Sequence, residues 1–95
     1  MPAYLVANVR VKDPVAYERY LQMVPASIEP FGGRYLARGG QTQVVEGHLP
    51  TGRMIILEFP SYEDAQRWYG STEYAEAKRL RQGCAEGDLV FIDGV

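Results

Sequence analysis

The sequence is poor in the residues that usually cross-link a small domain. It has one cysteine, Cys84, and one histidine, His48, among 95 residues. An internal disulfide and a zinc site of the Cys/His type are therefore both excluded. A chain of this length forms a single domain over residues 1–95, and it leaves much of its surface exposed when it folds alone. Because cross-links are absent, we expect a second protein chain to supply the missing stability.

The sequence also lacks a strong excess of charge and any long apolar run. A net charge of −2 does not indicate the basic surface that nucleic-acid-binding proteins usually carry. No stretch approaches the ~20 apolar residues that cross a bilayer, and no signal peptide is recognisable at the N-terminus. The hydrophobic share of 46% is typical of a globular protein. We therefore expect a cytoplasmic protein without a nucleic-acid or membrane partner.

The first third of the chain predicts a strand and a helix. Residues 3–11 are mostly β-forming, without Gly or Pro. Asp13 then suits a helix N-cap, and apolar and aromatic residues recur at helical spacing as far as Phe31. We expect Pro25 to kink or split this helix, and Gly32-Gly33 to end it.

The middle of the chain predicts two more strands. We interpret residues 34–47 as one long strand with a bulge at Gly39-Gly40, and residues 53–59 as the next strand. The alternative makes Gly39-Gly40 a hairpin turn. The bulge is favoured because residues 48–52 (His-Leu-Pro-Thr-Gly) form the richer loop sequence.

The last third predicts an interrupted helical segment and a final strand. Ser61 caps a helix together with Asp64, and Gly70-Ser71 interrupts it before a second helix begins. Residues 88–93 form the last strand. One face of the second helix is mainly apolar, and its members are Tyr74, Ala77, Leu80, Arg81 and Cys84.

The order βαββαβ predicts a ferredoxin-like α+β fold, with helices on one face of a four-stranded antiparallel sheet. The other face should then be polar, yet both faces of the strands at 53–59 and 88–93 are apolar. A large apolar sheet face is not left exposed on a monomer. The pattern therefore predicts a homodimer that packs sheet against sheet.

Motifs spread over nearly the whole chain support this fold. They are Asp13-Pro14, Gly32-Gly33-Arg34-Tyr35-Leu36, Arg38-Gly39-Gly40, Val45-Glu46-Gly47, Leu57-Glu58-Phe59-Pro60-Ser61, Trp68-Tyr69 and Leu80-Arg81. The combination resembles the uncharacterised bacterial family of unknown function numbered thirteen-thirty, in the dimeric α/β-barrel superfamily. That family often carries Asp-Trp at the position of His48-Leu49. The resemblance implies a dimeric α/β barrel, and the superfamily includes cofactor-independent monooxygenases and isomerases.

Other proteins with the same element order are excluded. The strand at 53–59 lacks the Gly-aromatic run of an RNA-recognition motif. A metallochaperone needs a Cys-x-x-Cys loop, which is absent. Lys12-Asp13-Pro14 carries no glycine-rich anion loop of the acylphosphatase kind.

The candidate ligand-binding residues are polar or aromatic side chains on the strands and helices. They are Asn8, Arg34, Arg38, Glu58, Tyr17, Tyr20, Trp68 and Tyr69. Glu58 needs a cationic partner if it is buried, and Arg10, Arg34 or Arg38 can supply one. Such a pair either fixes the interface or lines a cavity that binds a carboxylic acid. The aromatic residues either form the core or border a pocket.

For four further residues a structural interpretation is favoured. His48 is expected to be an exposed loop residue, although a general base or an iron ligand is the alternative. Cys84 is expected to be a packing residue. Arg79 and Arg81 lie near the end of a helix, where they favour its dipole.

Three functions remain open. The first is a binding module for a small organic acid or carbonyl compound, with no metal and no cofactor. The second is a cofactor-independent enzyme, of monooxygenase or isomerase type, on a small activated substrate, which rests on analogy of fold. The third is a non-catalytic structural dimer.

Overall fold

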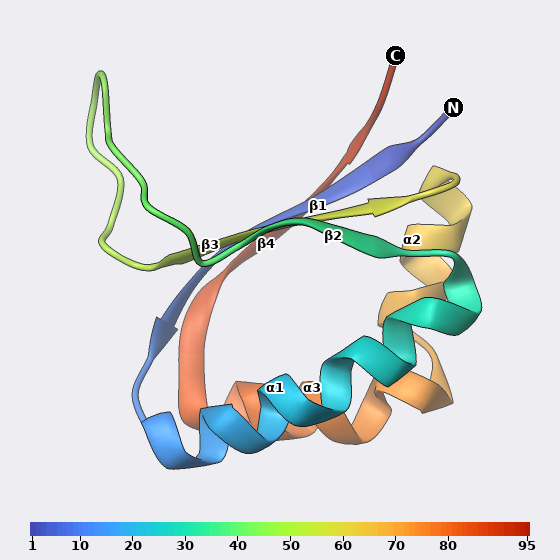
Figure 1. Ribbon diagram of the computed structural model, residues 1–95, viewed down its shortest axis with the longest axis horizontal. Helices are drawn as coiled ribbons and strands as arrows, with labels where there is room; N and C mark the ends of the chain where they lie inside the picture. Colours follow the sequence, from blue (N-terminus) through green and yellow to red (C-terminus); the bar gives the residue numbers. More distant parts are fainter.

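The computed structural model describes residues 1–95 and confirms the predicted ferredoxin-like fold. Its elements, in chain order, are β1 (Ala3–Val11), α1 (Pro14–Ile28), the 3-10 turn η1 (Glu29–Phe31), β2 (Arg34–Arg38), β3 (Arg53–Phe59), α2 (Tyr62–Tyr69), α3 (Thr72–Cys84) and β4 (Ala85–Asp93). The strands form one antiparallel sheet in the order β2-β3-β1-β4. All the helices lie on one side of this sheet (Figure 1).

The ends of α1 are set by the predicted residues. The side chain of Asp13 accepts hydrogen bonds from the backbone N–H groups of Val15 and Ala16, at 3.1 and 3.2 Å. Gly32 follows η1 with φ of 72°, a left-handed conformation that suits glycine. Pro25 does not split the helix, which runs unbroken to Ile28, so that part of the expectation is wrong. Pro25 lies in the last turn, where its missing N–H removes a single intrahelical hydrogen bond.

The interruption of the second helical segment is confirmed. Ser61 caps α2, since its hydroxyl accepts from the N–H of Asp64 at 3.1 Å and donates to the Asp64 carboxylate at 2.9 Å. The segment breaks at Gly70, and Ser71 caps α3 by accepting from the N–H of Tyr74 at 3.1 Å. The last strand begins at Ala85 rather than at residue 88.

The prediction of one strand over residues 34–47 is wrong. β2 ends at Arg38, its register shift lies between Tyr35 and Ala37, and residues 39–52 form an irregular loop. The Gly39-Gly40 bulge and the alternative tight hairpin turn are therefore both excluded. β2 is an edge strand whose single neighbour, β3, begins at Arg53. Because Arg38 pairs with Ile55, only Met54 and Arg53 of β3 lie beyond this pair, and the N–H of Gly39 still donates to the carbonyl of Met54 at 2.8 Å. Residues 41–47 have no strand to pair with. The loop projects away from the helices (Figure 1).

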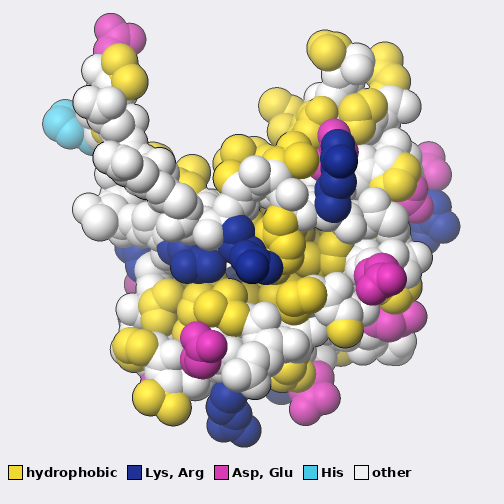
Figure 2. All heavy atoms as spheres, in the orientation of Figure 1, with side chains coloured by type: hydrophobic (Ala, Val, Ile, Leu, Met, Phe, Trp, Pro, Cys, Tyr) yellow, Lys and Arg dark blue, Asp and Glu magenta, His cyan; other side chains and the backbone are white.

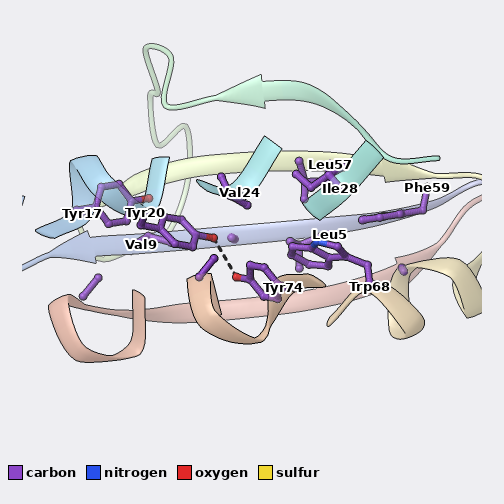
Figure 3. Close-up of a cluster of buried hydrophobic side chains, with 14 of the residues drawn as sticks. Leu5, Val9, Tyr17, Tyr20, Val24, Ile28, Leu57, Phe59, Trp68 and Tyr74 are labelled. Atoms are coloured by element: carbon purple, nitrogen blue, oxygen red, sulfur yellow. Dashed lines mark hydrogen bonds between the residues drawn. The ribbon is translucent and has the colours of Figure 1, made fainter. Parts of the chain in front are cut away.

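The core lies between the sheet and the helices (Figure 3). The sheet contributes alternate residues of β1 and β3, because successive side chains of a strand point to opposite faces. Trp68 is almost fully buried, its ring centroid lies 4.1 Å from that of Tyr74, and its Nε1–H donates to the Ser27 hydroxyl at 3.1 Å. The largest fully buried side chains are Trp68, Tyr74 and Phe59.

The opposite face of the sheet, called the outer face below, carries no helix. Its centre is apolar and is formed by Val6, Met54, Ile56, Val90 and Ile92. Val90 and Ile92 are 57% and 55% exposed in the single chain. Ion pairs border this centre: Arg34 with Glu58 at one end, and Arg10 with Asp88 at the other. None of the helices in the structure combines the length and the apolar character needed to cross a membrane.

Candidate functional site

A small cavity lies between the helix-side face of the sheet and the helices. Its volume is about 30 Å³, and its walls are mainly apolar side chains of β1, β3, α1 and α3. A space of this size holds about two water molecules. It therefore accepts a single functional group of a ligand rather than a whole drug-sized molecule.

Three arginines are the charged residues among the cavity's lining. Arg38 is the last residue of β2, Arg53 is the first residue of β3, and Arg81 comes from α3. The four ion pairs of the structure involve other basic residues, so none of these three guanidinium groups is paired with a carboxylate. Figure 2 shows Lys and Arg side chains gathered between the sheet and the helices, bordered by hydrophobic side chains.

Arg81 is the most deeply buried of these cations, at 6% exposed. It follows Ala77 by one helical turn and Tyr74 by two, which places all three on the buried side of α3. The Nε–H of Arg81 donates to the Tyr74 hydroxyl at 3.3 Å. Tyr20 and Tyr74 share a further hydrogen bond of 2.9 Å between their hydroxyls (Figure 3).

Three of the tyrosines around the cavity, Tyr17, Tyr20 and Tyr35, remain neutral at physiological pH. Burial raises the pKa of Tyr17, Tyr20 and Tyr35 above the ordinary value for tyrosine. They therefore provide hydroxyl groups for hydrogen bonds but no negative charge. The positive charge of the arginines consequently has no carboxylate counter-charge in the cavity wall. Burial lowers the pKa of Arg81, a cost of desolvating the charge, while the hydroxyls of Tyr74 and Tyr20 raise it and leave it raised overall.

Arg38 and Arg53 lie side by side on the helix-side face, where β2 and β3 meet the loop. Arg38 pairs in register with Ile55, and Arg53 lies two residues from Ile55 on the same face. The Nε of Arg53 is buried without a hydrogen-bond partner, whereas the Arg38 guanidinium is exposed and lies 4.7 Å from the ring centroid of Tyr35. Gly39 has φ of 72°, and a side chain there would collide with the Arg53 guanidinium.

The structure divides the predicted site residues between two faces of the sheet. Tyr17, Tyr20, Trp68 and Arg38 line the cavity. Glu58, Arg34 and Asn8 lie on the outer face, so the sheet separates them from the tyrosines.

The residues outside the cavity have other contacts. The carboxylate of Glu58 accepts from the Nε–H of Arg34 at 2.7 Å, so Arg34 is the cationic partner of Glu58. Asn8 donates from its side-chain amide to the carbonyl of Pro50 at 3.0 Å and holds the base of the loop. Tyr69 packs against Phe91 and also lies outside the cavity.

Sequence reasoning missed three cavity residues as ligand-binding candidates: Arg53, Arg81 and Tyr35. Strand alternation would have found Arg53, because it shares a face with Ile55 and Leu57. Arg81 was placed on the inner side of its helix but interpreted through the helix dipole. Its burial depends on how α3 packs against the rest of the fold, which local spacing does not reveal.

The remaining candidates lie apart from the cavity. His48 is exposed in the loop, as expected. Cys84 is buried as the last residue of α3, and burial raises the pKa of its thiol. No three His, Cys, Asp or Glu side chains cluster in a way that could hold a metal ion.

Fold and site together define a ferredoxin-like domain with a cationic cavity on its helix side. The sequence profile described as "Domain of unknown function (DUF1330)" matches residues 2–95, and the chain belongs to this family. Among curated proteins, none matches the chain.

Solved structures share the fold at low sequence identity. One is the RPA0582 protein of unknown function from Rhodopseudomonas palustris, which is 21% identical with a TM-score of 0.78 over 99% of this chain and 82% of that chain. A dimeric ferredoxin-like protein of unknown function from Jannaschia sp. CCS1 is 12% identical, with a TM-score of 0.61 over 100% of this chain and 99% of that chain. SnoaB, a cofactor-independent oxygenase from Streptomyces nogalater, is 7% identical, with a TM-score of 0.67 over 99% of this chain and 93% of that chain. Identities this low establish the fold alone.

Proposed function

We propose that this protein is a homodimer that binds a small organic acid in the cavity between sheet and helices. The observation that carries the binding proposal is the set of three arginines at one cavity without a carboxylate partner. An uncompensated cation as buried as Arg81 is unfavourable for the folded chain. An anionic ligand removes this disadvantage by supplying the missing counter-charge.

The chemistry of the wall suits an organic acid. An arginine guanidinium binds a carboxylate through two parallel hydrogen bonds, which gives both affinity and orientation. The Tyr20 and Tyr74 hydroxyls add hydrogen bonds beside Arg81. The apolar residues of β1 and β3 supply a surface for the carbon skeleton, as in most small-molecule sites.

Binding is tested by calorimetric titration with a panel of small carboxylic acids. We expect at least one acid to bind the wild-type protein, and Arg81→Gln to weaken that acid at least about tenfold, since a charge-assisted hydrogen bond contributes this much. Arg79→Gln is the matched control, because Arg79 is exposed on the same helix and lies outside the cavity. Failure of every acid to bind would overturn the binding proposal and favour a purely structural dimer.

The homodimer is supported by the outer face. Its apolar centre has no cover within the chain, and an antiparallel sheet with one face in water should be polar there. The loop of residues 39–52 and the two chain ends rise beyond this face and leave a hollow between them (Figures 1 and 2). A second copy related by a two-fold axis would bury the apolar centre. The fold of the Jannaschia protein described as dimeric gives further support.

Dimer formation is tested by sedimentation equilibrium. We expect the wild-type chain to sediment as a dimer and Val90→Asp to shift the equilibrium toward the monomer, because the substitution buries an unpaired charge in the interface. Val15→Asp is the control, since Val15 is 77% exposed on α1 and carries the same chemical change away from the outer face. A wild-type chain that sediments as a folded monomer would contradict the proposal.

A cofactor-independent enzyme is the second candidate. The linked hydroxyls of Tyr20 and Tyr74 next to Arg81 favour it, because such donors stabilise the oxyanion of an enolised carbonyl compound. The fold shared with SnoaB is compatible with it. Turnover of a carbonyl substrate that Tyr74→Phe abolishes without weakening substrate binding would identify an enzyme. Binding without turnover would instead support the first proposal, a protein that binds an organic acid without converting it.

A further inference from the structure

The three arginines occupy two separate positions around the cavity. Arg81 comes from the helix layer and lies beside the hydrogen-bonded pair Tyr20 and Tyr74. Arg38 and Arg53 come from β2 and β3, at the sheet edge where the loop begins. The site therefore has an inner cationic position and a second one at its edge. Apolar side chains of β1, β3 and α1 make up most of the remaining wall.

The size of the cavity limits how much of a ligand can lie inside it. A volume of about 30 Å³ accommodates one carboxylate-sized group beside Arg81 and little more. The rest of a ligand must extend toward the exposed guanidinium of Arg38. The buried Nε–H of Arg53 has no hydrogen-bond partner, so the edge position offers a donor for a second anionic group.

We propose that the ligand is a small dianion with two separate anionic groups joined by a short apolar segment. One group binds Arg81 and the Tyr74 hydroxyl, and the other binds Arg38 and Arg53. This inference rests on the proposed function and specifies the substrate class of the same site. Two charges accommodate three arginines better than one does. The apolar segment spans the distance between the inner position and the exposed guanidinium of Arg38.

The test is a calorimetric titration with matched pairs of acids at one ionic strength. The pairs are butyrate with succinate, valerate with glutarate, hexanoate with adipate, and benzoate with phthalate. We expect at least one diacid to bind about tenfold or more tightly than its monoacid, as expected for an added bidentate guanidinium contact. Inorganic phosphate, which carries its charges on one group, is expected to bind more weakly than that diacid.

Variants then assign the two ends of the ligand. The double variant Arg38→Gln/Arg53→Gln should abolish the preference for the diacid and leave monoacid binding nearly unchanged. Arg81→Gln should weaken both acids, and Arg79→Gln should change neither. Arg38→Lys, which keeps the charge but not the two parallel donors of the guanidinium, should retain part of the preference and controls for disturbed folding.

The outcomes separate this inference from the function on which it rests. If monoacids bind as tightly as diacids in every pair, the dianion inference fails while binding of an organic acid stands. If phosphate binds as tightly as the best diacid, two separated anionic groups are not required and the inference also fails. If no acid binds, both proposals fail together.

Discussion

Replacement of Arg81 by methionine should stabilise the protein in the absence of ligand. Arg81 is 6% exposed and has no carboxylate partner, and its hydrogen bond to Tyr74 spans 3.3 Å. The residual desolvation penalty of a buried ion is several kcal/mol in real proteins. Loss of the hydrogen bond costs about 1–1.5 kcal/mol, and Tyr74 keeps its bond to Tyr20. Methionine retains most of the apolar stem of arginine.

The expected balance is a gain of about 1–3 kcal/mol in the free energy of unfolding. For a chain of this length, each kcal/mol raises the melting temperature by about 4–8 °C. Urea denaturation measures the gain, and all variants are compared at one protein concentration because unfolding of a dimer depends on concentration.

Two control variants make the result interpretable. Arg79→Met changes an exposed arginine of the same helix and should alter stability by less than about 0.5 kcal/mol. Arg81→Lys keeps the charge and should give no gain. If Arg81→Met instead destabilises the protein by more than about 1 kcal/mol, Arg81 is a structural residue. The argument for an uncompensated cationic cavity would then be refuted.

Two further predictions concern buried groups that titrate. The pKa of Tyr17, Tyr20 and Tyr35 is raised by burial, so above about pH 10 the unfolded chain loses these protons while the folded chain keeps them. Stability should therefore be constant below that pH and fall above it, by at most about 1.4 kcal/mol per pH unit for each such tyrosine, in denaturation curves recorded across the alkaline range. Tyr20→Phe should make the decline shallower, and an unchanged slope would contradict this account. Cys84 is buried with a raised thiol pKa, so it should react with a thiol reagent only at the rate of unfolding; rapid labelling of the native protein would show that this site is open.

Local patterns in the chain were sufficient for most of the secondary structure. Asp13, Ser61 and Ser71 cap helices through their own side chains, and these bonds form within three residues of the cap. The apolar character of both sheet faces could likewise be read from alternation along single strands. Such features depend on neighbours in sequence and therefore need no knowledge of tertiary contacts.

The error at residues 39–47 has a tertiary cause. Within this segment Thr42, Val44 and Val45 are β-forming, but a strand persists only where a neighbouring strand supplies hydrogen-bond partners. β3 begins at Arg53 and Arg38 pairs with Ile55, so the last backbone hydrogen bond is that of Gly39 to Met54 and residues 41–47 become part of the loop. The length of one strand is thus decided by the start of another.

The candidate site shows the same division between what local sequence and what tertiary structure determine. The sequence by itself determined the fold, the family and the presence of arginines and tyrosines that suit an acid ligand. Tertiary structure alone decided which of them meet, because the sheet sends Glu58 and Arg34 to one side while Arg38, Arg53 and Arg81 converge on the other. Charges that lie up to 43 positions apart in the chain, as Arg38 and Arg81 do, are brought together by the packing of helices on a sheet, which local spacing does not encode.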